Sequence, residues 1–260
     1  MGRVITCDVG NSNIMLGCFE GDSLLLTARL KTHQKWTQQS LDHAIRRAFI
    51  AGGLEEDLFE GSIISSVVPE LNGLLSGALE RLTGQKPLVM TASLETGVDL
   101  GHYDTTTLGM DRVVDMAAAA FYYGTPVAIY DLGTCTTLSV LDGEAVLLGG
   151  MISAGIQLSL DAQADHTSQL PQLTAAPTEQ LLGNDTVANM ISGAVASCGI
   201  MIEGVTDRIA ETYKLTDMKV VITGGNGKLV LPWIRRKVSY DPDLLLKGML
   251  VIYRKNAGTV

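Results

Sequence analysis

The chain has 260 residues, 46% of them hydrophobic and 18% charged, which suits one or two folded domains and excludes a disordered chain. Its formal net charge of −9 argues against a nucleic-acid partner, because phosphate backbones are bound by clusters of Lys and Arg. The four cysteines form no C-x-x-C pair, so we expect reduced thiols in a cytoplasmic protein. The longest charge-free apolar run, Val187 to Ile202, is shorter than the ~20 residues of a membrane span, so we expect no membrane partner.

The N-terminal segment predicts a strand over Val4 to Cys7 that carries Asp8 at its end. Gly10 permits a tight turn, and three small polar residues follow it. Successive donors in a turn form an anion-binding nest, and a neighbouring carboxylate suits Mg²⁺ held through water beside a nucleotide. Taken alone, the pattern is equally well explained by a polar turn that closes a hairpin.

The helices expected in chain order are Trp36 to Ile50, Pro69 to Leu82, Val113 to Tyr123 and a long apolar stripe from Val187 to Ile209. The stripe indicates a core helix, and part of it could instead pack against a second subunit. The segment from Asp161 to Pro177 is rich in Gln, Thr, Pro and Ala and predicts a long surface loop.

A repeat organises the chain. The segment from Val127 resembles the segment from Val4, so that Asp131 matches Asp8 and an equivalent glycine follows two residues later in each. Later strands match as well, at Ile63 to Ser66 and at Lys219 to Ile222. We therefore predict two α/β domains, 1–115 and 116–260, each built as a β-meander, a helix, a strand and a helix. Two such phosphate loops could grip one polyphosphate from both sides.

Two further motifs suggest chemistry. The loop T-G-G-N-G places Gly224 and Gly225 after a strand, where a base or ribose could lie against the backbone, although an ordinary strand-to-helix turn has the same composition. The motif G-M-D-R places Asp111 and Arg112 before an expected helix. Asp111 could accept a proton from a hydroxyl nucleophile while Arg112 holds an anion, or the two could form a helix cap and an ion pair.

Taken together and in order, these motifs resemble those of type III pantothenate kinases, over a match from Val4 to about Tyr253. They read D-V-G-N-S, S-S-V-V-P, T-G-V, G-M-D-R, D-L-G-T-C-T-T, G-G-M-I-S-A-G-I, G-N-D-T and T-G-G-N-G. The resemblance implies two duplicated ribonuclease-H-like domains of the actin-like ATPase fold, each with a mixed five-stranded sheet flanked by helices. It also implies phosphorylation of pantothenate by ATP, the first step of coenzyme A synthesis, in a homodimer that needs Mg²⁺ and a monovalent cation, K⁺ or NH₄⁺.

The resemblance assigns roles to individual residues. It implies that Asp131 binds the monovalent cation, that Thr134 contacts ATP and that Asp111 is the proton acceptor. The first ATP loop comprises Asp8, Val9, Gly10, Asn11, Ser12, Asn13, Ile14 and Met15. The pantothenate contacts are Tyr103, Gly109, Met110, Asp111, Arg112 and Thr186.

The sequence departs from the family pattern at a few positions. Met110 stands where Ala is common and adds bulk beside the substrate, and Leu132 and Cys135 replace Phe and Ala in the second loop. One alternative is a non-catalytic regulator resembling the Bvg accessory factor, which shares the architecture. Another is a sugar kinase or exopolyphosphatase of the same superfamily, although those chains are usually longer and lack this placement of G-x-D-R.

Overall fold

The computed structural model describes residues 2–54, 59–101 and 103–257. The chain divides into two compact units. Unit 1 comprises Met1–Gly97, Leu108–Ala118 and Leu245–Val260, and unit 2 comprises Val98–Thr107 and Ala119–Leu244. The units therefore differ from the contiguous halves 1–115 and 116–260, because the chain's last helix is grouped with unit 1 and a short loop segment with unit 2.

Unit 1 contains a five-stranded mixed sheet in the order β3-β2-β1-β4-β5. β1 pairs antiparallel with β2 and parallel with β4, β2 pairs antiparallel with β3, and β4 pairs parallel with β5. The strands are β1 (Arg3–Val9), β2 (Asn13–Glu20), β3 (Ser23–Lys31), β4 (Phe59–Ser66) and β5 (Leu88–Val89).

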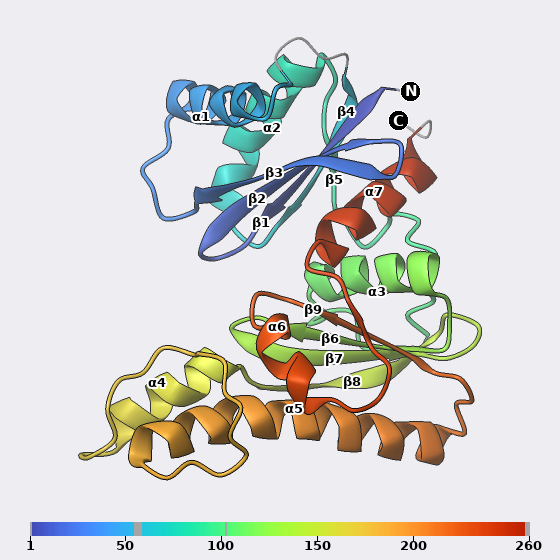
Figure 1. Cartoon of the computed structure of the whole chain (residues 1–260). Helices are drawn as coiled ribbons and strands as arrows, with labels where there is room; N and C mark the ends of the chain where they lie inside the picture. The colour runs from blue at the N-terminus through green and yellow to red at the C-terminus, as the bar shows by residue number, and fades with distance from the viewer. Residues whose placement is uncertain (1, 55–58, 102, 258–260) are drawn as a thin grey trace. The chain divides into compact units, whose positions relative to one another are not determined.

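Two helices cover one face of this sheet, α1 (Gln38–Ala51) and α2 (Pro69–Thr83), and Figure 1 shows them together on the same side. Both were expected from the sequence, and the Pro at the start of α2 occupies a position where its missing N–H has no cost. Alternate residues of β1, namely Ile5, Cys7 and Val9, are buried in the same core cluster as the apolar faces of the two helices. Because side chains alternate along a strand, Asp8 belongs to the opposite face.

Helix α7 (Leu244–Asn256) packs on that opposite face through small residues. A Cβ at Gly17 of β2 would meet Leu246, and a Cβ at Gly61 of β4 would meet the Tyr253 hydroxyl. Gly248 in turn lies against the backbone carbonyl of Val114 in α3 (Met110–Tyr123). The three glycines let the helix approach both the sheet and α3 at backbone distance.

Unit 2 repeats the topology of unit 1, in the strand order β10-β9-β6-β7-β8. β6 pairs antiparallel with β7 and parallel with β9, just as β1 pairs with β2 and β4. The strands are β6 (Val127–Leu132), β7 (Cys135–Leu141), β8 (Leu147–Ala154), β9 (Lys219–Thr223) and β10 (Ser239–Tyr240). The predicted fold class, two ribonuclease-H-like domains with mixed five-stranded sheets, is confirmed.

Helix α5 (Thr186–Tyr213) runs along one face of the second sheet (Figure 1) and shares a core cluster with Ala128, Tyr130 and Leu132 of β6. The buried Tyr130 hydroxyl hydrogen-bonds Thr206 of α5 at 2.9 Å. By length and composition alone α5 could cross a membrane, with a mean hydropathy of 1.3 over its most apolar window, of which 44% is buried. Its packing on the sheet is that of the core helix expected from the sequence.

Helix α4 (Ile156–His166) corrects one expectation, because residues 161–166 were predicted to lie in a surface loop. Gln157 donates to Asp161 one helical turn later at 2.8 Å, and the segment contains no Gly or Pro to interrupt the helix. The loop begins only at Thr167. The short helices α6 (Gly227–Val230) and η1 (Leu231–Trp233) follow β9 and complete the unit.

Candidate active site

The first predicted phosphate loop is the short connection between β1 and β2 in unit 1. The Gly10 N–H donates to the Asn13 carbonyl at 3.0 Å and closes the turn. Thr32, the residue after β3, braces the loop twice, since its N–H donates to the Ser12 carbonyl at 3.1 Å and its hydroxyl to the Gly10 carbonyl at 2.7 Å. Thr32 is buried, with an exposed fraction of 5%. Its role could not be predicted from the D-V-G-N-S motif, because Thr32 lies about 20 residues further along the chain.

The eight residues predicted to contact ATP in this loop differ in what they can offer. The side chains of Val9 and Ile14 are fully buried in the core, so only their backbone could face a nucleotide. Asn11 and Ser12 are exposed at the tip, where hydroxyl and amide groups are free to meet a phosphate. The loop therefore combines an anchored frame with a polar tip.

Asp8 lies next to the end of β1, in register with Met15 of β2 and Ser65 of β4. It faces away from the α1 and α2 side, while its neighbour Cys7 is buried there. Burial raises the pKa of the Cys7 thiol well above its ordinary value, and the negative charge of Asp8 adds to the rise. Cys7 is thus a neutral core residue, and Asp8 is the chemically available group.

The motif G-M-D-R opens helix α3, which begins at Met110, three residues earlier than predicted. Asp111 is exposed in the first turn, and its carboxylate accepts the Arg112 backbone N–H at 2.8 Å. A Cβ at Gly109 would collide with that carboxylate, so the glycine keeps room for it. Arg112 is 8% exposed and Asp111 is open to solvent, an arrangement in which Asp111 is the group accessible to a substrate.

In unit 2 the structure brings two predicted loops to one end of the sheet. Asp131 lies near the end of β6, in register with Thr223 at the end of β9. Its carboxylate lies close to Gly224, which adopts φ +86° and has no room for a Cβ between Asp131 and the backbone of Leu132. The Asn226 N–H donates to the Leu132 carbonyl at 3.1 Å and ties the T-G-G-N-G loop to the end of β6.

The second phosphate loop is one residue shorter than the first. β1 and β2 are separated by three residues, whereas Gly133 and Thr134 alone separate β6 from β7. The Gly133 N–H donates to the Cys135 carbonyl at 3.1 Å, and the Thr134 carbonyl accepts the N–H of Gly155 at 3.0 Å. Gly155 is the residue before α4, and its role was missed because the sequence reading did not place a helix there.

Gly155→Ala is expected to disturb this loop strongly. A Cβ at position 155 would collide with the backbone carbonyls of Gly133 and Thr134, and neither can retreat without moving the loop. We expect the KM for ATP to rise by about tenfold, which corresponds to ~1.4 kcal/mol of lost binding. Steady-state kinetics at varied ATP concentration measure this KM. Gly73→Ala on the exposed side of α2, where nothing lies within 4 Å, is the matched control and should leave the KM unchanged.

The other two predicted substrate contacts lie elsewhere in unit 2. Tyr103 is half-buried in a segment held to the β7–β8 connection, where the Asp99 N–H donates to the Ala145 carbonyl at 3.0 Å. Thr186 is the exposed first residue of α5, after the cap Asp185, which accepts the Ala188 N–H at 2.8 Å.

The groups at both strand ends suit hard cations. Among the described residues, no cluster of three or more His, Cys, Asp or Glu side chains could hold a metal by itself. Mg²⁺ in kinases is typically held by one or two carboxylates together with substrate phosphates, which fits the single carboxylate of Asp8. Asp131 offers a carboxylate at a cradle that a Cβ on Gly224 would fill, and a carboxylate oxygen is a ligand suited to a hard cation.

Comparison with known proteins identifies the family. The sequence model of the type III pantothenate kinase family matches residues 4–208 of this chain. A type III pantothenate kinase of Agathobacter rectalis is 31% identical over 97% of both chains, and one of Brevibacillus brevis is 33% identical over 97% of this chain and 99% of its own.

Solved structures share the fold at low identity. A Campylobacter jejuni protein assigned to the Baf family of transcriptional activators superposes with a TM-score of 0.58 at 19% identity, over 98% of this chain and 99% of its own. Component A of the (R)-2-hydroxyglutaryl-CoA dehydratase of Acidaminococcus fermentans superposes with a TM-score of 0.54 at 11% identity, over 99% of this chain and 100% of its own. These two likenesses concern the fold alone, whereas the family model and the curated relatives show that the chain belongs to the type III pantothenate kinase family.

Proposed function

We propose that this kinase transfers the γ-phosphoryl group of ATP to the primary hydroxyl of pantothenate, the reaction that begins coenzyme A synthesis. The proposal is carried by the duplicated strand ends, where Asp8 and Asp131 occupy equivalent positions and each precedes a glycine turn. Phosphoryl transfer depends mainly on positioning and charge stabilisation, which two such loops can supply. The names of the two curated relatives agree with this reaction.

The nucleotide roles divide between the two loops. The segment from Asp8 to Met15 binds the phosphates of ATP, with Mg²⁺ held by Asp8 through water. Thr134 and the glycines Gly224 and Gly225 also contact the nucleotide. Asp131 binds the monovalent cation, K⁺ or NH₄⁺, whose charge helps to neutralise the polyphosphate.

The pantothenate roles gather on the motif G-M-D-R. Asp111 accepts the proton of the attacking hydroxyl, for which its exposure at the start of α3 is suitable. Gly109 leaves space for that carboxylate. Arg112 and Met110 complete the pantothenate segment, and Tyr103 and Thr186 supply further contacts.

A direct assay of product formation tests the activity. Purified protein is incubated with Mg-ATP and pantothenate in KCl, NH₄Cl or NaCl, and phosphopantothenate is detected by mass spectrometry. We expect product in KCl and NH₄Cl and much less in NaCl. Absence of product in all three salts, from a protein that still binds ATP, would favour a non-catalytic regulator of this fold.

We also propose that the protein is a homodimer through α5. The unit-2 face around this helix leaves several large apolar side chains uncovered, namely Val187 (47% exposed), Ile200 (46%), Leu182 (86%) and Leu158 of α4 (41%). Two shallow cavities of about 230 and 280 Å³ flank Gly193 and Ser197 on the same helix. A second copy of the chain would bury this surface.

Ile200→Glu tests the dimer, because a charge on this face opposes burial. We expect wild-type protein to run as a dimer in size-exclusion chromatography with light scattering, and Ile200→Glu to run as a monomer. Leu25→Glu, at an apolar residue of β3 that is 41% exposed, is the control and should stay dimeric. A monomeric wild type would refute the proposal.

We place the protein in the cytoplasm. All four cysteines are free thiols, and Cys7 and Cys18 are buried apolar residues. A protein without disulfides suits a reducing compartment. ATP, the phosphoryl donor proposed above, is available there.

A further inference from the structure

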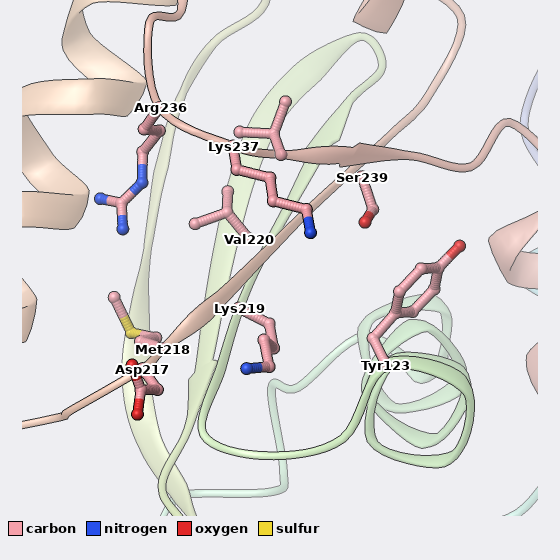
Figure 2. Close-up of a pocket in the computed structure, with 9 residues that line it drawn as sticks. Tyr123, Asp217, Met218, Lys219, Val220, Arg236, Lys237 and Ser239 are labelled. Carbon is pink, nitrogen blue, oxygen red and sulfur yellow. The ribbon is translucent and has the colours of Figure 1, made fainter.

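A pocket of about 360 Å³ lies in unit 2, apart from the loops described above. Figure 2 shows Lys219 and Lys237 in its middle, between Arg236 on one side and Tyr123 on the other. Its apolar wall is formed by Met218, Val220 and Val238, and Ser239 and Asp217 complete the lining. The volume falls within the range of small-molecule sites.

The pocket lies at the opposite end of the sheet from the second phosphate loop. Lys219 begins β9 and pairs with Val127, the first residue of β6, whereas Thr223 ends β9 and pairs with Asp131. The two ends are four residue steps apart along the strand, a span of about 13 Å. A ligand here would therefore occupy a site distinct from the nucleotide loops of unit 2.

The positive charges of the pocket are incompletely neutralised by the protein. No ion pair to Lys219 or Lys237 is formed by a carboxylate within the described part of the chain. Arg236 pairs with Asp207 at 2.7 Å through one terminal nitrogen, but its Nε is buried and has no acceptor among the described residues. That nitrogen is closed to a ligand, so the two lysines carry the unneutralised positive charge of the pocket.

The acidic and hydroxyl groups nearby are mostly engaged. The Tyr123 hydroxyl donates to Asp241 at 2.8 Å, and Glu203 accepts the backbone N–H groups of Arg235 and Arg236 at 3.0 and 3.2 Å. Desolvation raises the pKa of Tyr123, and the bond to Asp241 adds to the rise, so Tyr123 stays neutral. Asp217 is the one carboxylate in the lining, and it is exposed at the pocket's edge.

A surplus of cations is unusual in a chain with a formal net charge of −9. Lys side chains that line one cavity provide charge-assisted donors for phosphate oxygens. The apolar wall of Met218, Val220 and Val238 offers contact area to an organic group attached to the phosphate. We infer that this pocket binds a small phosphate-bearing anion, held by Lys219 and Lys237, at a site separate from the ATP loops. The inference is independent of the proposed kinase activity, because its test is binding.

Residue-resolved lysine acetylation is the first test. The protein is first saturated with Mg²⁺ and a non-hydrolysable ATP analogue, so that the nucleotide loops are filled. It is then labelled in glycerol 3-phosphate, in inorganic phosphate, or in sodium chloride at matched ionic strength, and acetylation of each lysine is followed by peptide mass spectrometry. Lys86 and Lys214, both exposed and outside the pocket, are internal controls.

We expect acetylation of Lys219 and Lys237 to slow in the phosphate-bearing solutions while the control lysines react unchanged. Protection by both compounds identifies the phosphate group as sufficient, and protection by the ester alone identifies an organic phosphate as the ligand. If Lys219 and Lys237 react at the same rate in all three solutions, the inference is wrong.

Paired variants provide the second test. Lys219→Gln with Lys237→Gln removes two positive charges from the pocket, and Lys86→Gln with Lys214→Gln removes the same charge elsewhere. By calorimetry on the analogue-saturated protein, we expect the pocket pair to bind the protecting phosphate compound at least about tenfold more weakly than the control pair. Equal affinity of the two pairs would overturn the inference.

Discussion

Asp111→Asn is expected to lower turnover by about 10²-fold or more. The Asn Oδ1 can accept the same Arg112 N–H that the carboxylate accepts at 2.8 Å, so the start of α3 should be preserved. The amide cannot take up a proton, so only the chemical role is lost. Steady-state kinetics at saturating ATP and pantothenate measure kcat, and calorimetry with an ATP analogue verifies that nucleotide binding is retained.

Asp22→Asn is the matched control for this experiment. Asp22 is exposed on the turn between β2 and β3 and pairs with Arg254 at 2.6 Å, so its replacement removes one carboxylate from the same unit. Surface ion pairs contribute at most about 1 kcal/mol, and we expect near-normal turnover. If Asp111→Asn also turned over normally, Asp111 would be a helix-cap residue and another group would be the proton acceptor.

Asp131→Ala should abolish most of the stimulation by K⁺. The side chain offers a carboxylate beside Gly224, and Ala removes the charge that would hold the cation there. Loss of a ligand should weaken cation binding by at least about tenfold, since even an outer-shell partner contributes that much. The measurement is activity against KCl concentration, with NaCl or choline chloride holding ionic strength constant.

Asp131→Asn is the graded comparison, because it keeps the side-chain volume and one neutral oxygen. We expect it to respond to K⁺ more weakly than wild type and more strongly than Asp131→Ala. Circular dichroism checks that both variants are folded. An unchanged potassium titration in Asp131→Ala would place the cation at another site.

The repeat is the part of the fold that the residue pattern predicted well. An aspartate, a glycine and two apolar runs recur at Asp8 and Asp131, and local pattern suffices here because each strand and turn is encoded by adjacent residues. The repeat accounts for the two five-stranded sheets, one in each unit, whose strand orders are equivalent. Helices α1, α2 and α5 were also anticipated, because their apolar spacing and terminal residues are local signals.

What the pattern missed depends on contacts between distant segments. Thr32 braces the first loop from the residue after β3, and Gly155 supports the second loop from the start of α4, so neither role is visible in the motif itself. The buried side chains of Val9 and Ile14 show a related limit, because membership of a motif does not reveal which atoms face outward. The shorter second loop became clear only when strand register had defined its ends.

The sequence by itself determined the family, the duplicated architecture and the three aspartates proposed for chemistry. Those properties reside in short motifs, whose residue types and order survive without knowledge of contacts. Only the tertiary structure decided that Asp111 is exposed beside a buried Arg112, that Gly224 and Gly155 close around the second loop, and that Lys219 and Lys237 share a pocket. The physical reason is that exposure, steric fit and unpaired charge are set by side chains brought together from separate strands and helices, and no local pattern encodes that juxtaposition.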